Sequence, residues 1–211
     1  MNLALVSLIA LCLITAAPVR AAPLLLSEVL YDAVGSDDGA VFVELFGPAG
    51  LLLDGHVIEG VNGSDGSLTT SIALVGTLPD DGFFVLADGV SGVSAIAQVD
   101  LVANFDFQNG PDSIVLRGPD GSVLDALGYG AFGAGDVFAG EGSPAPDPSA
   151  GESLARRFAN LDTNDNAADF ISLSQPTPGS GPELPEPPVA WLVACGLSLL
   201  VRHRVRAGVA R

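Results

Sequence analysis

Five aspartate and asparagine residues, whose side chains all carry oxygen atoms, fall within eight positions: Asp162, Asn164, Asp165, Asn166 and Asp169. Calcium takes about six to eight hard oxygen ligands on a flexible loop, and alternating aspartate and asparagine residues supply such ligands. The segment therefore predicts a calcium site. The alternative is a capped turn, in which these side chains bond their own backbone. An EF-hand is excluded, because a loop starting at Asp162 has no glycine at its sixth place and no glutamate at its twelfth.

Two further acids, Glu28 and Glu44, stand inside otherwise apolar segments. An unpaired carboxylate is costly to bury, so each of them needs a partner. Arg156 and Arg157 are two of the few cations in the central part of the chain, and we expect them to form structural ion pairs with these glutamates. The alternative is a functional pocket built around the two carboxylates.

Catalysis by thiols or by paired imidazoles is excluded for residues 22–187. Both cysteines, Cys12 and Cys195, lie in the apolar ends, so this part has no thiolate nucleophile and no zinc–thiolate site. His56 is its sole histidine, and we interpret it as a half-buried strand residue rather than a metal ligand. We predict no catalytic and no cofactor-binding residue. A carboxylate-based hydrolase stays open as an alternative, and it would need a cleft with two convergent acids, one of them with a raised pKa.

The charge of the central part is strongly negative. All 25 acidic residues lie between Glu28 and Glu186, and only three basic residues accompany them: Arg117, Arg156 and Arg157. Such a domain is repelled by phosphate backbones, which disfavours nucleic-acid binding. The acids would attract cations, or they would serve solvation alone, as in a salt-adapted structural protein.

Strands rather than helices must position these residues. The middle of the chain alternates apolar and polar residues or shows short apolar runs, with no helical period. Val41, Val43 and Leu45 fall on one face of a strand whose other face is also largely apolar, which indicates burial on both sides. We expect short strands over residues 24–31, 41–46, 56–59, 71–75, 83–87, 100–103, 113–117, 123–128, 153–158 and 169–173.

The connections between these strands are rich in turn-forming residues. Residues 117–123 give the strongest hairpin pattern in the chain, because the segment combines Gly-Pro with Asp-Gly. Residues 130–151 predict a long surface loop and residues 175–184 a linker, and no helix of ordinary length is expected. Eight to ten strands at a spacing of roughly ten residues predict an all-β sandwich.

Both ends of the chain are apolar. Residues 1–21 predict a secretory signal peptide, with an apolar run over residues 3–17 and a small-residue cleavage site after Ala21. Near the other end, residues 188–201 form an uncharged run followed by the basic cluster Arg202, Arg204 and Arg206. This order predicts a membrane segment with a basic cytoplasmic tail over residues 202–211. The run spans only about 21 Å, so it suits a transient membrane stop better than a permanent anchor.

Several segments of the middle resemble the bacterial lamin-tail domain over residues 22–178. These segments occur in the same order as in that family: 26–32 (LSEVLYD), 41–45 (VFVEL), 83–88 (FFVLAD), 123–129 (VLDALGY), 151–157 (GESLARR) and 162–170 (DTNDNAADF). The resemblance implies an immunoglobulin-like β-sandwich without catalytic residues. One departure is Gly55-His56, where the family usually has a tryptophan after the glycine.

The C-terminal part is similar to the PEP-CTERM sorting signal of Gram-negative bacteria. Pro185, Glu186 and Pro187 match its signature within a linker over residues 179–187, and the apolar run and arginines follow. The resemblance implies processing by an exosortase-like enzyme and delivery to the cell envelope or exterior, with transient anchoring in the membrane. The alternative is an ordinary short C-terminal anchor.

Together these features predict an exported, surface-sorted structural or binding module that is not an enzyme. Its expected partners are an envelope or matrix protein, a polysaccharide or calcium, besides the membrane and the processing enzyme. The carboxylate-based hydrolase and the purely structural salt-adapted protein remain the alternatives.

Overall fold

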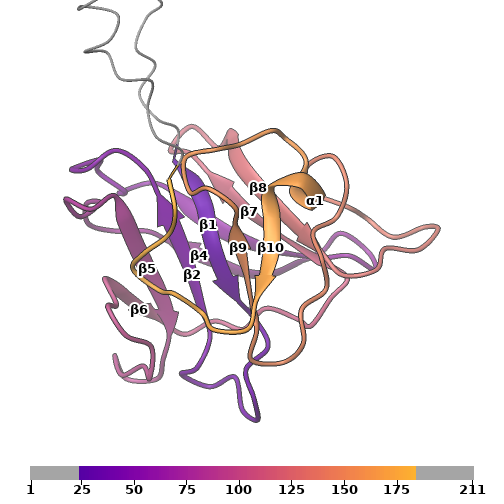
Figure 1. The fold of residues 1–211 in the computed structure, drawn as a ribbon, viewed down its shortest axis with the longest axis horizontal. Helices are drawn as coiled ribbons and strands as arrows, with labels where there is room; N and C mark the ends of the chain where they lie inside the picture. Colours follow the sequence, from indigo (N-terminus) through magenta and orange to yellow (C-terminus); the bar gives the residue numbers. More distant parts are fainter. Residues whose placement is uncertain (1–23, 184–211) are drawn as a thin grey trace, which may run out of the picture.

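The computed structural model describes residues 24–183, which form an all-β sandwich of two sheets (Figure 1). The six-stranded sheet has the order β10-β9-β1-β2-β5-β6. Its strands are β1 (Leu25–Leu30), β2 (Phe42–Phe46), β5 (Phe83–Asp88), β6 (Leu101–Ala103), β9 (Ser153–Arg156) and β10 (Phe170–Leu173). The four-stranded sheet has the order β4-β3-β7-β8. Its strands are β3 (Val57–Asn62), β4 (Leu68–Ala73), β7 (Asp112–Arg117) and β8 (Val123–Tyr129).

The strand predictions are confirmed at all ten places, and among the described residues the sole helix is the four-residue α1 (Asn166–Asp169). The largest difference concerns β4, which runs over Leu68–Ala73 instead of residues 71–75. Most of β4 is exposed at the edge of its sheet, so no buried apolar pattern marks its start.

The predicted hairpin over residues 117–123 joins β7 to β8. Its turn is closed by a hydrogen bond from the Gly118 amide to the Ser122 carbonyl, and Gly121 takes a φ of 81°. The Asp120 carboxylate accepts bonds from the amide and the hydroxyl of Ser122. Local turn chemistry alone therefore accounts for this connection.

The main core lies between the two sheets. Apolar residues of β1 and β2 meet apolar residues of β3, β7 and β8 there, among them Leu26, Val29, Leu45, Ile58, Leu116 and Leu127. The pairing of β1 with β2 shifts between Leu26 and Glu28. Because Leu26 and Val29 both face the core, the bulge leaves Ser27 and Glu28 on the outer side of the sheet.

The outer face of the six-stranded sheet is covered as well. Phe42 packs with Val85 under Ile96 and Val99, and Phe46 packs with Phe83 and Ala159. Burial on both faces was predicted for the strand over residues 41–46. The structure confirms it, because every residue of β2 is buried. The covered patches leave a gap over the middle of β1 and β2, where Glu28 and Glu44 lie directly opposite each other.

A segment after β10, residues 174–182, crosses this gap, and we call it the strap. It is the yellow end of the ribbon in Figure 1, and it runs over the outer face of the six-stranded sheet. The predicted linker therefore begins as a segment that contacts the sheet through Thr177 and Gly179.

Four predicted features of the ends lie outside the described residues: the signal peptide (1–21), the tripeptide Pro185, Glu186 and Pro187, the membrane segment (188–201) and the basic tail (202–211) with Arg202, Arg204 and Arg206. Within residues 24–183, no helix combines the length and the apolar character needed to cross a membrane.

Candidate functional site

The guanidinium of Arg156 is the centre of a buried polar cluster between the two sheets. Arg156 ends β9 and its side chain is 1% exposed. Its Nη2 donates to Asp125 Oδ2 of β8 at 2.7 Å, and its Nη1 donates to Asp169 Oδ2 of α1 at 3.1 Å. Asp162 lies slightly farther away, at 3.5 Å from Nη1. One arginine therefore joins the six-stranded sheet, the four-stranded sheet and the helix.

Neutral groups complete the environment of this arginine. The carbonyls of Leu26 and Leu161 accept bonds from its Nε and Nη1, each at 3.0 Å. The ring of Phe170 lies beneath the guanidinium, 4.7 Å from the carbon Cζ to the ring centroid, a geometry that favours a cation–π interaction. Asp169 also accepts the amide and hydroxyl of Thr163. Removing Arg156 would thus leave charged groups buried without a counter-ion.

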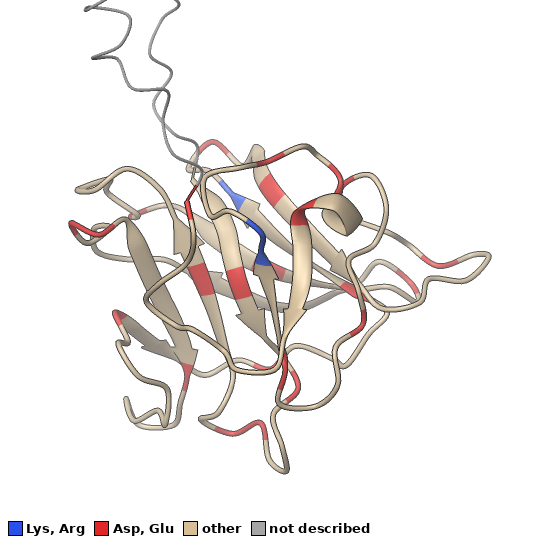
Figure 2. Cartoon of the chain, in the orientation of Figure 1, with Lys and Arg blue, Asp and Glu red and all other residues tan. Residues whose placement is uncertain are grey.

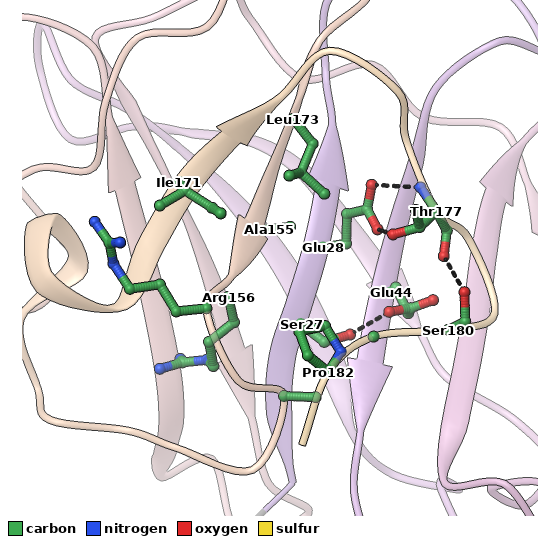
Figure 3. Close-up of a pocket in the computed structure, with 13 residues that line it drawn as sticks. Ser27, Glu28, Glu44, Ala155, Arg156, Ile171, Leu173, Thr177, Ser180 and Pro182 are labelled. Carbon is green, nitrogen blue, oxygen red and sulfur yellow. Dashed lines mark hydrogen bonds between the residues drawn. The ribbon is translucent and has the colours of Figure 1, made fainter. Parts of the chain in front are cut away.

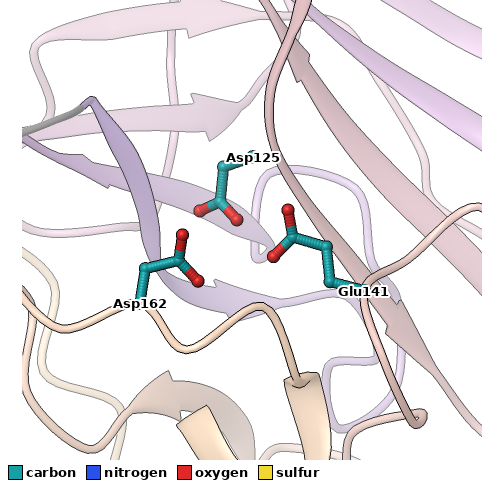
Figure 4. A group of neighbouring side chains, drawn as sticks. All are labelled: Asp125, Glu141 and Asp162. Atoms are coloured by element: carbon teal, nitrogen blue, oxygen red, sulfur yellow. The ribbon is translucent and has the colours of Figure 1, made fainter.

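Glu141, from the loop after β8, adds a third carboxylate beside Asp125 and Asp162 (Figure 4). One oxygen from each of the three lies within 4.8 Å of the others. Glu141 Oε2 is buried and has no hydrogen-bond partner among the described residues. Burial, together with the nearby charges of Asp125 and Asp162, raises the pKa of Glu141 to about 7. A proton or a cation at this oxygen would relieve the repulsion among the three acids.

The three carboxylates are a geometric candidate for a cation. They offer only part of the roughly six to eight oxygens that calcium takes. Asp125 and Asp162 already contact the guanidinium of Arg156, which would repel a second cation. Burial raises the pKa of Asp125 in spite of the opposing pull of Arg156. The cluster is therefore mainly a network of ion pairs within the protein. A bound cation would have to share the carboxylates of Asp125 and Asp162 with Arg156.

The five residues predicted as calcium ligands have separate hydrogen-bonding roles. Asp162 accepts the amide of Asn164, and Asp165 accepts the amide of Ser143. Asn164 is exposed with a φ of 57°, and Asp169 bonds Arg156 and Thr163. Of the five, only Asp162 belongs to the group of three carboxylates. The calcium prediction for this loop stays a prediction.

Asn166 ties the loop of Glu141 to β8. Its fully buried side chain accepts the amides of Gly128 and Glu141, each at 2.9 Å, and donates to the Ala126 carbonyl at 2.8 Å. Its own amide donates to the Glu141 carbonyl. This residue fixes the position from which the Glu141 side chain reaches the arginine cluster.

Glu28 and Glu44 form the second polar site, under the strap (Figure 3). Glu28 accepts bonds from the Ser153 hydroxyl and from the amide and hydroxyl of Thr177. Glu44 accepts bonds from the Ser27 hydroxyl at 2.6 Å and from the Gly179 amide at 2.5 Å. The predicted ion pairs of these glutamates with the two arginines are wrong, because every donor to the carboxylates is neutral.

The two arginines are used elsewhere. Arg156 turns to the buried aspartates, and Arg157 donates to the Ala168 carbonyl from an exposed position. Both still line the pocket of about 70 Å³ next to the glutamates. Burial raises the pKa of Glu44 to about 8, against the opposing effect of its bonds from Ser27 and Gly179. This site therefore matches the alternative of a carboxylate pocket more closely than that of an ion pair.

His56 is buried in the turn before β3, and its Nδ1 lies 3.1 Å from the Leu53 carbonyl oxygen. The described residues place no other histidine or cysteine near it, since the central part of the chain holds none. The sequence analysis interpreted His56 as a half-buried strand residue, whereas the structure buries it and places it one residue before β3.

Two residues of the arginine cluster were absent from the sequence prediction, Asp125 and Glu141. Asp125 stands in an apolar strand, so the rule applied to Glu28 and Glu44 would also have marked it as a buried acid that needs a partner. Glu141 lies in a glycine-rich loop and carries no such mark. Figure 2 shows why composition could not single them out: acidic residues are spread over the loops and strands, while basic segments are few.

Comparison of the chain with protein-family models, with curated proteins and with solved structures gives no match in any of the three.

Proposed function

We propose that this chain is an exported, surface-sorted β-sandwich module of the lamin-tail kind, with an immunoglobulin-like fold, that acts without catalysis at the bacterial envelope or in the extracellular matrix. The observation that carries the proposal is the use of the buried acids. Asp125, Asp169, Glu28 and Glu44 each accept bonds from side chains or amides of the chain itself. These acids support the fold, which is what a structural module requires.

The ends of the chain support the sorting part of the proposal. A signal peptide over residues 1–21 would deliver the chain to the export machinery, and the tripeptide Pro185, Glu186 and Pro187 would mark the site of processing. The apolar run over residues 188–201 and the arginines after it would hold the chain in the membrane until an exosortase-like enzyme acts. The acidic loops would then face the outside, where they can meet cations, proteins or polysaccharides.

Mass spectrometry of the mature protein tests this proposal. The full chain is expressed in a host that has the processing enzyme, beside a variant with Ala at positions 185–187. We expect the mature wild-type protein to lack residues 1–21 and to end near residue 187, and we expect the variant to keep its C-terminal residues in the membrane fraction. A wild-type protein that keeps residues 188–211 at the cell surface contradicts the sorting proposal.

The carboxylate pair Glu28 and Glu44 favours a second candidate, an extracellular hydrolase. One acid of the pair has a raised pKa and both line a pocket, as that chemistry requires. The pocket of about 70 Å³ is smaller than a sugar ring needs, so the strap would have to move before a substrate could enter. Hydrolysis of a polysaccharide by the wild type that is lost in Glu44→Gln would support this candidate.

A further inference from the structure

The edge strand β4 presents backbone groups to solvent. It pairs with β3 on one side alone, and the pairing continues one step beyond β4, where the Leu74 amide donates to the His56 carbonyl at 2.9 Å. In an antiparallel ladder every second residue bonds the neighbouring strand, and the residues between them turn their amides and carbonyls the other way. Ser71, Ala73 and Val75 are these residues, and all three are exposed.

The other three edges of the two sheets are covered or short. The edge of β8 is closed by the Asn166 side chain, which accepts the Gly128 amide and donates to the Ala126 carbonyl. The edge strand β6 has three residues and the edge strand β10 has four. Within residues 24–183, β4 and its continuation therefore form the longest edge at which a further strand can add.

This edge is also the least charged stretch of an acidic domain. Residues 66–79 hold no charged side chain, and they are the longest such run between Glu28 and Glu186. Edge strands that stay unpaired usually carry a lysine, a proline or an inward charge. The strand β4 carries none of these, and its one irregularity is a bulge near its start. On the neighbouring β3, Glu59 is paired with Arg117. An added strand therefore meets no charged side chain along β4.

The distribution of charge selects the partner of this edge. A cationic partner is attracted to the acidic loops, because the central part holds 25 acidic residues and only three arginines. A second copy of this chain is repelled by the same loops, and the uncharged edge is where it can approach. Ser71 and Ala73 have small side chains, so two backbones can come to the strand spacing of about 4.8 Å there. The edge therefore fits a second copy of the chain.

We propose that two copies of the chain pair through β4 in antiparallel orientation, around a two-fold axis at Ala73. This axis places Ala73 opposite Ala73 of the second copy, and it places Ser71 opposite Val75. The outward residues of the two copies then exchange about six backbone hydrogen bonds. Val75, which is 54% exposed in the single chain, is covered by the second copy. The four-stranded sheets of the two copies join into one continuous sheet.

Disulfide trapping of the full chain, with detergent micelles in excess over protein, tests the pairing and its register. Cys12 and Cys195 are first changed to serine, so that one new cysteine reports alone. Ala73→Cys should give a cross-linked dimer on mild oxidation, because opposite Cα atoms about 5.5 Å apart suit a disulfide. Ser71→Cys is the matched control, because its two copies lie about 13 Å apart along the strands and cannot be bridged. Equal cross-linking at both positions, at neither, or at position 71 alone overturns the proposal.

Sedimentation of the same full chain measures the strength of the pairing. Ala73→Glu places two like charges opposite each other across the axis and should weaken dimerisation by at least about tenfold. Val123→Glu adds the same charge at an exposed position of β8 in the same sheet and should leave dimerisation unchanged.

Salt gives an independent readout of the same dimer. A rise in sodium chloride from about 50 mM to about 500 mM should strengthen it, because salt screens the repulsion between two acidic copies. A dimer that dissociates in salt, or one that forms equally well in Ala73→Glu, overturns the proposal. A wild type that stays monomeric also overturns it and leaves the edge to a strand of another protein.

Discussion

Arg156 and Asp125 connect the two sheets of the sandwich through one buried hydrogen-bonded ion pair of 2.7 Å. The two residues are 31 positions apart in the sequence and come from β9 and β8. Asp125 also accepts the Leu26 amide of β1, so the pair fixes three strands against one another. Neither side chain is more than 1% exposed, so the loss of either partner would destabilise the fold strongly.

Arg156→Met should lower the free energy of unfolding by about 3–5 kcal/mol, because it leaves Asp125 and Asp169 buried without their counter-ion. Urea denaturation of the full chain measures the loss. The matched control is Arg117→Met, which breaks a partly exposed pair with Glu59 and should change stability by less than about 1 kcal/mol. Equal effects of the two substitutions would show that the buried network does not stabilise the fold in this way.

Glu141→Gln should make the protein more stable at pH 8 and leave it unchanged near pH 4. The pKa of Glu141 is raised in the folded protein to about 7, from 4.5. The wild type therefore loses stability as the pH rises from about 4.5 through about 7, whereas the glutamine variant does not. Solvent reaches part of this side chain, so we expect a gain on the order of 1 kcal/mol at pH 8. Denaturation curves of both proteins at pH 4 and pH 8 test this prediction. A Glu141→Gln variant that is less stable than the wild type at pH 8 contradicts it.

Asn166→Ala should destabilise the fold by about 3 kcal/mol, because the amides of Gly128 and Glu141 and the carbonyl of Ala126 all lose their partner. Asn164→Gly is the matched control at an exposed asparagine two residues away, where glycine suits the φ of 57°. We expect that variant to stay within about 0.5 kcal/mol of the wild type. Similar melting temperatures for both variants would rule out the anchoring role of Asn166.

The calcium hypothesis predicts that calcium alone raises the melting temperature of the full chain above its value in chelator. A ligand at about 100 times its dissociation constant adds about 2.7 kcal/mol, which corresponds to several degrees for a domain of this size. Magnesium and sodium serve as controls.

Two variants separate the two places where calcium could bind. Asp165→Ala should remove the effect if the ion sits on the loop of residues 162–169, and Glu141→Gln should remove it if the ion sits among the three carboxylates. An equal response to all salts would assign the acidic residues to solvation.

The sequence was sufficient for the strands because each strand pattern is local. Alternation in residues 41–46 and the turn chemistry of residues 117–123 depend on neighbours in the chain, and both predictions are confirmed. Partners of buried charges depend on distant residues. Glu28 and Thr177 are 149 positions apart, and nothing near either residue predicts their contact.

The number of acidic residues also limits what the sequence predicts. With 25 carboxylates and three arginines in the central part, composition could not tell which acids Arg156 would bind. Glu28 and Glu44 interrupt apolar strands, but Asp125 does the same, and Asp125 is the acid that pairs with Arg156. The pairing depends on the bulge after Leu26, which turns Glu28 to the outer face of its sheet, away from the guanidinium of Arg156.

Residues 22–187 contain no cysteine, so the sheets are linked by the ion pair of Arg156 and Asp125, whereas antibody domains link theirs by a disulfide. An ionic link needs no oxidant to form and no isomerase to correct it. It opens when the chain unfolds and closes again with the fold, and reducing agents do not affect it. No step in forming this link between the sheets depends on the redox state of the surroundings.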